Sequence, residues 1–349
     1  MEKNKIRNEK KMKVASIIGH FGFNRNLLNG QTIKTKNVSF ALKEIVGQDG
    51  IQEIDTSGGP LKLISLIFKT RKALYNSKNI IFLLAKNGLK FLLPWIVFFN
   101  KKRRKKLHFI VIGGWLHLMC EENLRISSML KTIDYIYVET VGMKNLLQQQ
   151  GFSNILVMPN FKNINPVKND ELISIYKPPF RLCTFSRIMK EKGIEEAIKA
   201  VIFLNQKNRY NKYSLDIYGQ VEKTQEEWFA NLMKSCPNYI KYMGFVNSEN
   251  SVNAIKGYYC LLFPTFYEGE GFAGTILDAM AAGVPTIASD WKYNSEIIND
   301  NNGVLYKTHD INALAMAIET LKTSKDKCLE EYKKYAPSSA IQVLFERLA

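Results

Sequence analysis

The chain has 349 residues, of which 46% are hydrophobic, so it holds enough apolar material for packed cores and is not a disordered chain. Its 49 Lys and Arg outnumber 32 Asp and Glu, which gives a net charge of +17. The five cysteines are scattered and form no C-x-x-C pair, which argues against a disulfide framework or a zinc knuckle and favours a reducing, cytoplasmic compartment.

The surplus of positive charge lies entirely in the first half of the chain. Residues 1–165 contain 27 basic and 10 acidic residues, whereas residues 166–349 contain 22 of each. A chain of this length is expected to form two domains. The segregation of charge predicts that these domains have different partners and that the N-terminal one faces something anionic.

Short apolar runs alternate with helical patterns in the first half, after a charged start, residues 1–12, that we expect to be a frayed extension rather than a secretory signal. Continuous apolar runs separated by helix-length connections are typical of a parallel sheet that is covered on both faces. The predicted strands span residues 14–19, 79–84, 107–112, 135–138 and 155–158.

The pattern restarts after residues 160–179, which contain three prolines and are the predicted linker. Apolar residues at helical spacing indicate one helix through 194–201 and another through 314–321, for which Asp310 is the predicted N-cap. The predicted strands of this half span residues 180–185, 214–218, 239–243, 259–263, 285–288 and 304–306.

These patterns predict an α/β fold with two tandem Rossmann-like domains, residues 1–165 and 166–330. Ligands of open parallel sheets bind beyond the carboxyl ends of the strands, so we expect the site in the cleft between the domains. Residues 331–349 are predicted to form a helix that packs back on the N-terminal domain.

The segment 261–290 carries the most chemical information. A strand ends at Pro264, a glycine-rich loop follows, and a helix is predicted from about Thr275 until Gly283. The free N–H groups at that helix start provide an anion site. The loop leading into it consists of Glu270, Gly271, Phe272, Ala273 and Gly274, and Asp278 lies about one turn inside the helix.

This segment resembles the donor-binding signature of glycosyltransferase family four (group 1), which are retaining enzymes with the two-domain GT-B fold. The family pattern is Glu, seven residues, Glu, then Ala-Met-Ala and Gly-x-Pro, and it is in register with Glu270, Asp278, 279–281 and 283–285. The resemblance implies that Glu270 is catalytic and contacts the donor sugar, and that Asp278 holds the nucleotide ribose. Aspartate in place of the second glutamate shortens this reach by one methylene.

Two further segments are similar to the donor domain of the family. FSRIMKEKG places Arg187 and Lys192 at the spacing that the family uses to neutralise the donor pyrophosphate, whose charge rises as the glycosidic bond breaks. Gly244, Phe245 and Val246 resemble its base-contacting turn. DYIYVET and VMPNF look like its interdomain approach, so the resemblance extends over nearly all of 135–320.

The N-terminal half resembles the family less closely. Gly30 follows the first strand, where backbone amides would approach the donor phosphates. His117 follows the predicted strand 107–112, and the family often has a histidine near this loop, which makes His117 a second catalytic candidate. The alternative for His117 is a histidine that is only hydrogen-bonded within the structure.

An apolar segment, residues 88–99, precedes a block of six cations. Such a pair of features is typical of binding to an anionic leaflet, where each cation contributes about 1 kcal/mol. One alternative is a core helix followed by a solvated turn. Another, a nucleic-acid site, lacks aromatic residues interleaved with the cations. The block consists of Lys101, Lys102, Arg103, Arg104, Lys105 and Lys106.

The sequence therefore predicts a retaining transferase that moves a hexose-type sugar from a nucleotide-diphosphate donor, a UDP-sugar, to a saccharide acceptor. We expect the acceptor to be lipid-linked and to serve surface polysaccharide biosynthesis at the inner face of the plasma membrane, with no nucleic acid as partner. The resemblance implies no metal and no other cofactor. Two alternatives stay open: a nucleotide-sugar epimerase of the same architecture, and a non-enzymatic basic protein that binds membranes or nucleic acid.

Overall fold

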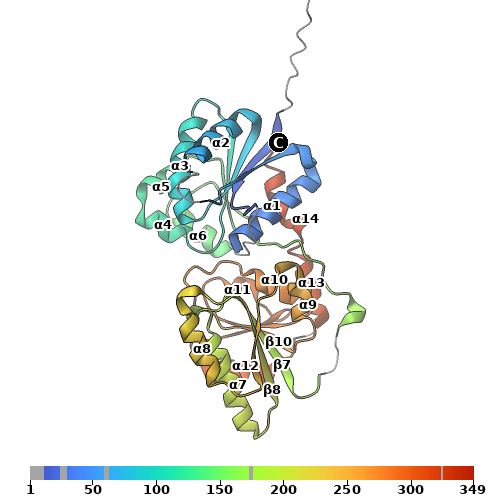
Figure 1. Cartoon of the computed structure of the whole chain (residues 1–349). Coiled ribbons are helices and arrows are strands. Elements are labelled where there is room, and N and C mark those ends of the chain that lie inside the picture. Colours follow the sequence, from blue (N-terminus) through green and yellow to red (C-terminus); the bar gives the residue numbers. More distant parts are fainter. Residues whose placement is uncertain (1–11, 24–29, 59–62, 173–175, 324) are drawn as a thin grey trace, which may run out of the picture.

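The computed structural model describes residues 12–23, 30–58, 63–172, 176–323 and 325–349. Within them the chain forms two α/β domains, one above the other (Figure 1). The N-terminal domain comprises β1 (Lys13–Gly19), α1 (Gly30–Val46), β2 (Ile51–Asp55), α2 (Leu63–Asn76), β3 (Ser77–Leu83), α3 (Lys86–Asn100), β4 (Lys106–Ile110), α4 (Leu116–Glu122), α5 (Leu124–Leu130), β5 (Tyr135–Val138), α6 (Val141–Gln149) and β6 (Ile155–Val157).

The N-terminal sheet is parallel and has the strand order β2-β1-β3-β4-β5-β6. One face packs on α2, α3, α4, α5 and α6, and the other on α1 and on a helix from the end of the chain (Figure 1). Because helices cover both faces, central strands carry continuous apolar runs, as in β3, where residues 80–83 are apolar and fully buried. The five predicted strands of this half are confirmed, with ends that differ by at most two residues.

The prediction for this half was incomplete, because it lacked β2. This strand lies at the edge of the sheet, where it pairs only with β1 among the described strands. Its sequence, IQEID, buries only Ile51 and Ile54, while Glu53 reaches out to Lys43 of α1. An edge strand in which three of five residues are polar does not show the continuous apolar run on which the prediction depended.

The C-terminal domain repeats this plan around a second parallel sheet, of order β12-β11-β10-β7-β8-β9. All six predicted strands are confirmed to within one residue at each end. Asp310 caps its helix as predicted, accepting a hydrogen bond from Ala313 N at 2.9 Å. The elements are β7 (Phe180–Phe185), α7 (Ile194–Asn208), β8 (Tyr213–Tyr218), α8 (Glu226–Lys234), β9 (Ile240–Gly244), α9 (Ser251–Ile255), β10 (Cys260–Phe263), α10 (Gly274–Ala281), β11 (Thr286–Ser289), α11 (Asn294–Ile297), β12 (Gly303–Tyr306), α12 (Ile311–Thr320), α13 (Lys325–Lys333) and α14 (Pro337–Phe345).

The chain passes between the domains twice. After β6, the described part of residues 158–179 contains one short 3-10 turn, Asn169–Glu171, and no longer element. Near the end of the chain, α13 packs against α10 of the C-terminal domain, and α14 then packs against α1 of the N-terminal domain, with Ala340, Ile341 and Leu344 buried there. The expected extension at residues 1–12 lies outside the described residues except for Met12.

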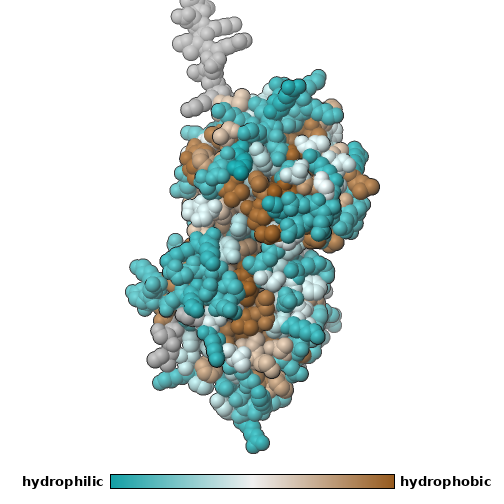
Figure 2. Space-filling view, turned by 180° about the vertical axis from the view of Figure 1, so that it is seen from behind, coloured by the Kyte–Doolittle hydropathy of each residue, from teal (hydrophilic) through white to brown (hydrophobic). Residues whose placement is uncertain are grey.

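The two domains touch through a pair of glycine-containing loops. Gly114 N donates a hydrogen bond to Gly269 O at 3.1 Å, and a Cβ atom on Gly114 would lie 2.0 Å from the carbonyl oxygen of Glu270. Glu296 of α11 accepts hydrogen bonds from Val141 N and Gly142 N at the start of α6, each at 2.7 Å. On the face opposite to that of Figure 1, hydrophobic residues gather along the middle, where the domains meet (Figure 2).

Among the described helices, none combines the length and the apolar character that crossing a bilayer requires.

Candidate functional site

A cavity of about 400 Å³ lies between the domains, at the carboxyl ends of both sheets. Strand order reverses between β1 and β3 in one sheet and between β7 and β10 in the other, so the crevices of the two sheets meet there. The predicted site residues that line the cavity are Gly30, Arg187, Lys192, Phe245, Val246, Glu270, Gly271, Phe272, Ala273, Gly274 and Asp278. The sequence analysis places most of them at strand ends or in the following loops, and Asp278 about one turn inside the helix that follows.

Glu270 is held at one end of the cavity by two donors on the same domain. Its Oε2 atom accepts hydrogen bonds from Lys192 Nζ at 2.6 Å and from Thr265 Oγ1 at 2.8 Å. Both partners of the ion pair are mostly buried, with side-chain exposures of 8% for Glu270 and 13% for Lys192. A carboxylate fixed in this way is available to accept hydrogen bonds from hydroxyl groups in the cavity.

Lys192 reaches Glu270 because of a tight approach between two loops. Gly193, which precedes α7, has φ +69°, and a Cβ atom there would lie 2.0 Å from the carbonyl oxygen of Pro264. Only glycine combines this left-handed conformation with so close a contact. The turn at Gly193 therefore places Lys192, after β7, beside the loop after β10.

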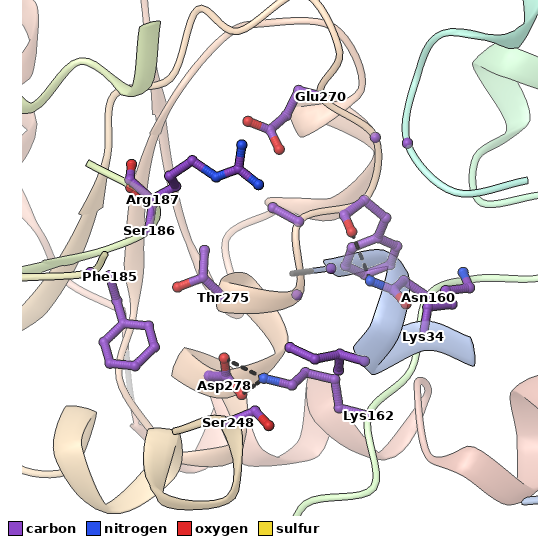
Figure 3. A pocket seen from close by; sticks show the side chains of 18 of the residues that line it. Lys34, Asn160, Lys162, Phe185, Ser186, Arg187, Ser248, Glu270, Thr275 and Asp278 are labelled. Carbon is purple, nitrogen blue, oxygen red and sulfur yellow. Dashed lines mark hydrogen bonds and ion pairs between the residues drawn. The ribbon is translucent and has the colours of Figure 1, made fainter. Parts of the chain in front are cut away.

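Asp278 lies at the other end of the cavity and is paired with Lys162 (Figure 3). Lys162 Nζ is 2.5 Å from Oδ1 and 2.7 Å from Oδ2, and Ser251 Oγ donates to Oδ1 at 2.8 Å. Burial raises the pKa of the Asp278 carboxyl, and the charge of Lys162 and the hydrogen bonds from Lys162 and Ser251 act against this rise. Lys162 comes from the linker, so the pair ties that segment to α10.

Arg187 extends into the cavity from the end of β7, with its guanidinium directed toward the Glu270 end (Figure 3). It forms an ion pair with Glu222, with 3.1 Å between Nη1 and Oε2, and about half of its side chain is exposed. Between Arg187 and Asp278 lies the start of α10, where the first backbone N–H groups have no partner within the helix. A cation and a helix N-terminus thus lie along the same cavity.

A second buried ion pair comes from the N-terminal domain and was not predicted. Lys34 of α1 binds Glu139, and both side chains are about 4% exposed. Glu139 Oε2 also accepts a hydrogen bond from Phe272 N of the other domain at 3.1 Å, which joins the domains at the cavity wall. The sequence held a partial signal, because Glu139 belongs to DYIYVET and Lys162 follows VMPNF, the two segments that resembled the interdomain approach.

Two of the residues predicted to be catalytic or donor-binding do not line the cavity. Gly244 ends β9 with its neighbours Phe245 and Val246 in the wall but not itself. His117 lies buried on α4, where its backbone oxygen accepts a hydrogen bond from Gln150, and burial together with nearby Lys292 lowers its pKa. Its Nδ1 atom has no hydrogen-bond partner among the described residues. A catalytic role for His117 stays a prediction.

The six-cation block lies away from the cavity. Lys106 begins β4, so the block is at the amino edge of the sheet, opposite to the carboxyl edge that faces the cleft. Asn100 closes the turn by bonding Lys105 through both backbone groups, and Lys106 Nζ binds the backbone oxygen of Ala349. An acceptor bound by this block would therefore not lie directly in the cavity.

The described residues contain no cluster of three or more His, Cys, Asp or Glu side chains arranged to hold a metal ion.

Part of the chain is similar in sequence to known glycosyltransferases. Residues 168–339 match the family model of glycosyl transferases group 1. An uncharacterized glycosyltransferase of Methanocaldococcus jannaschii, MJ1069, is 27% identical over 189 residues, which are 51% of this chain and 46% of that protein. The GtfA subunit of the UDP-N-acetylglucosamine–peptide N-acetylglucosaminyltransferase of Streptococcus agalactiae is 31% identical over 169 residues, 46% of this chain and 32% of the relative. The aligned part thus spans less than half of either relative.

The fold of this chain is similar to that of solved structures over nearly its whole length. Anabaena HepE, determined in complex with UDP and glucose, superposes with a TM-score of 0.72 and 15% identity, covering 97% of this chain and 99% of that one. At this identity the likeness concerns the fold. The chain therefore has the GT-B fold, and its C-terminal domain matches the group 1 glycosyltransferases.

Proposed function

We propose that this chain is a retaining glycosyltransferase that transfers a hexose-type sugar from a UDP-sugar to a saccharide acceptor. One observation carries the proposal: Glu270 and Asp278, each paired with a lysine, lie at opposite ends of one interdomain cavity, with Arg187 and the start of α10 between them. Anabaena HepE, which binds UDP and glucose, and GtfA, named for UDP-N-acetylglucosamine, support a UDP-sugar donor.

The arrangement of the lining residues supports one orientation for the donor. The ribose hydroxyls would meet Asp278 and Lys162, and the base would lie on the wall that contains Phe185, Phe245 and Val246. The pyrophosphate would then lie along the start of α10, where N–H groups and the helix dipole favour negative charge. Arg187 would lie beside the pyrophosphate, and the donor sugar would contact Glu270.

The reaction that we propose breaks the bond between the anomeric carbon and the β-phosphate oxygen and forms a bond from that carbon to an acceptor oxygen on the same face. The acceptor proton passes to the departing phosphate, so the products are the glycoside and UDP. Charge develops on the leaving diphosphate as the bond breaks, and Arg187, Lys192 and the helix start stabilise it most in the transition state. Glu270 orients the sugar hydroxyls. No metal is required in this scheme.

The acceptor belongs to the other half of the molecule. The N-terminal half carries the whole charge surplus, while the donor half is balanced. We therefore propose that the acceptor is a saccharide on a phosphate-bearing lipid, used for surface polysaccharides and presented at the inner face of the plasma membrane.

Two measurements test this function. Calorimetry should detect UDP binding, and a panel of UDP- and GDP-sugars should reveal donor hydrolysis that persists after treatment with EDTA. NMR of the donor alone distinguishes the epimerase, since an epimerase would invert a sugar centre without an acceptor. Failure to bind any nucleotide diphosphate would contradict both enzymes and favour a non-enzymatic binding protein.

A further inference from the structure

The charge surplus of the N-terminal domain is concentrated in one stretch of the chain. Residues 56–120 contain 13 Lys and Arg and no Asp or Glu. This stretch includes α2, α3 and the block 101–106, and α2 and α3 pack side by side on the same face of the sheet (Figure 1). The outer surface of these two helices therefore has no carboxylate of its own to balance its cations.

The same two helices expose large apolar side chains. On α2, Ile64, Phe68 and Tyr75 are 68%, 62% and 46% exposed, at spacings that put them on one side of the helix, and Phe98 of α3 is 62% exposed. A stripe from residue 64 to residue 75 extends about 16 Å along the helix axis. The opposite sides of both helices, with Leu66, Leu74, Leu92 and Ile96 among others, fill the core.

Cations and aromatic rings meet on this outer surface. The guanidinium of Arg103 lies 3.5 Å from the centre of the Tyr75 ring, which joins the basic turn after α3 to the end of α2. Lys69, Arg71 and Lys72 are exposed on α2 between Phe68 and Tyr75. On α3, the rings of Trp95 and Phe98 are 6.5 Å apart, edge to face. We call the exposed side chains of α2, α3 and 101–104 the docking face.

We propose that the docking face binds an anionic lipid bilayer, with Ile64, Phe68, Trp95 and Phe98 entering the interfacial layer and the cations meeting lipid phosphates. Burial of exposed apolar and aromatic groups in such a layer is favourable, and long cationic side chains extend from the same face to the headgroups. A nucleic acid would use the cations but gives aliphatic Ile64 no favourable environment. The proposal rests on the proposed function only for its purpose, which is to hold the enzyme where a lipid-linked acceptor is found.

The test uses the full chain and sedimentation with vesicles of phosphatidylcholine, with and without phosphatidylglycerol. We expect clear binding only to the anionic vesicles. Phe68→Ser/Phe98→Ser should weaken it at least about tenfold, since two aromatic side chains lose their burial in the interface. Its matched control is Met316→Ser on α12, which is 65% exposed on the other domain and should leave binding unchanged.

A second pair of variants tests the contribution of the cations to vesicle binding. Substituting Lys101, Lys102, Arg103 and Arg104 with Gln should weaken binding at least about tenfold. The control replaces Lys307, Lys322 and Lys327 with Gln, which are cations of the balanced domain, two of them exposed loop residues and one on α13, and should have little effect. Equal losses in both sets would mean that net charge alone governs binding and would overturn the proposal.

Insertion is measured through Trp95. Brominated phosphatidylglycerol should quench part of the tryptophan fluorescence, and this part should vanish in Trp95→Phe, which leaves Trp115, Trp228 and Trp291. The membrane proposal would be refuted if Trp95 were not quenched. It would also be refuted if the protein bound single-stranded RNA as tightly as the vesicles and Phe68→Ser/Phe98→Ser did not weaken that binding. UDP calorimetry on the wild type and on Phe68→Ser/Phe98→Ser separates the two proposals. We expect both proteins to bind UDP equally, since the docking face lies away from the cavity. A wild type that binds anionic vesicles but not UDP would contradict the transferase and not the docking face.

Discussion

Lys162 of the interdomain linker and Asp278 of α10 form a buried ion pair in the cavity wall, with 2.7 Å between Nζ and Oδ2. Their side chains are 9% and 3% exposed. The residues are 116 positions apart, so the contact fixes the path of the linker against the donor domain. The acid that the resemblance assigns to ribose binding therefore also anchors the linker to the C-terminal domain.

Breaking this pair from one side should be costly. In Lys162→Met, Asp278 keeps its burial and loses its cation, so we expect a loss of about 3–5 kcal/mol in the free energy of unfolding. In Lys162→Met/Asp278→Asn no charge is left buried, and the loss should be smaller than the sum of the single losses. Urea unfolding measures Lys162→Met, Asp278→Asn and the double variant. The control is Lys207→Met, which breaks the exposed pair with Glu319 and should cost less than about 1 kcal/mol.

The cost of Lys162→Met should depend on pH in a defined direction. Burial already raises the pKa of Asp278, and loss of Lys162 raises it further, so the folded variant binds more protons than the unfolded chain above about pH 4. Stability then falls as pH increases through this window. We expect the difference between Lys162→Met and the wild type, from urea unfolding, to be smaller at pH 4 than at pH 7. A difference independent of pH would show that lost packing, not the charge of Asp278, is responsible.

Glu270 should affect the reaction rather than nucleotide binding. Glu270→Gln keeps the shape of the side chain and removes the charge that faces Lys192, so sugar hydroxyls lose their charged acceptor. We expect kcat/KM for transfer to fall on the order of a hundredfold or more, while calorimetry gives a UDP affinity close to that of the wild type, since UDP has no sugar at that end. Glu268→Gln is the control, because Glu268 is an exposed loop acid two positions away, paired with Lys292. Comparable losses in the two variants would contradict the assignment of Glu270.

Arg187 should contribute to UDP affinity directly. Charge-assisted hydrogen bonds to phosphate account for about 1.5–3 kcal/mol, so Arg187→Ala should weaken UDP binding roughly 10- to 150-fold in calorimetry. Glu222→Gln removes the ion-pair partner but leaves the guanidinium, so its UDP affinity should match or exceed that of the wild type. If both variants weaken binding equally, Arg187 acts only by holding Glu222 and the proposed pyrophosphate contact is wrong.

Much of the fold could be predicted because both sheets are covered on two faces. β10 is buried throughout and β3 is buried from residue 79 to residue 83, and their apolar runs are visible without knowledge of their neighbours. The edge strand β2 was not predicted for the opposite reason, since three of its five residues are polar and only partly buried. The loop and helix around Glu270 were predictable because their chemistry is local, with strand, loop and helix start following one another within 30 residues.

The remaining parts of the site depend on contacts between distant segments. Lys34 and Glu139 are 105 positions apart and come from α1 and the end of β5, and no pattern within either segment indicates that they meet. A lysine in an amphipathic helix is ordinarily a solvated residue, so its burial follows only from tertiary packing. His117 shows the converse, because a plausible position after a strand did not bring its side chain into the cavity wall.

The contact between Gly114 and the loop at Glu270 should control how closely the domains approach. A Cβ atom in Gly114→Ala would lie 2.0 Å from the carbonyl oxygen of Glu270 and 3.2 Å from the Tyr293 ring, so one loop must move and the bond from Gly114 N to Gly269 O is lost. Because this displacement shifts Glu270 relative to the N-terminal domain, where we propose that the acceptor binds, the rate of transfer should fall strongly. UDP, which the C-terminal domain would hold, should still bind. Small-angle scattering should detect a larger radius of gyration. Gly88→Ala is the control, since the atoms nearest to its Cβ, Cβ and Cδ2 of Leu84, are 3.8 Å away and nothing has to move. Unchanged transfer in Gly114→Ala would mean that the reaction does not need this contact between the domains.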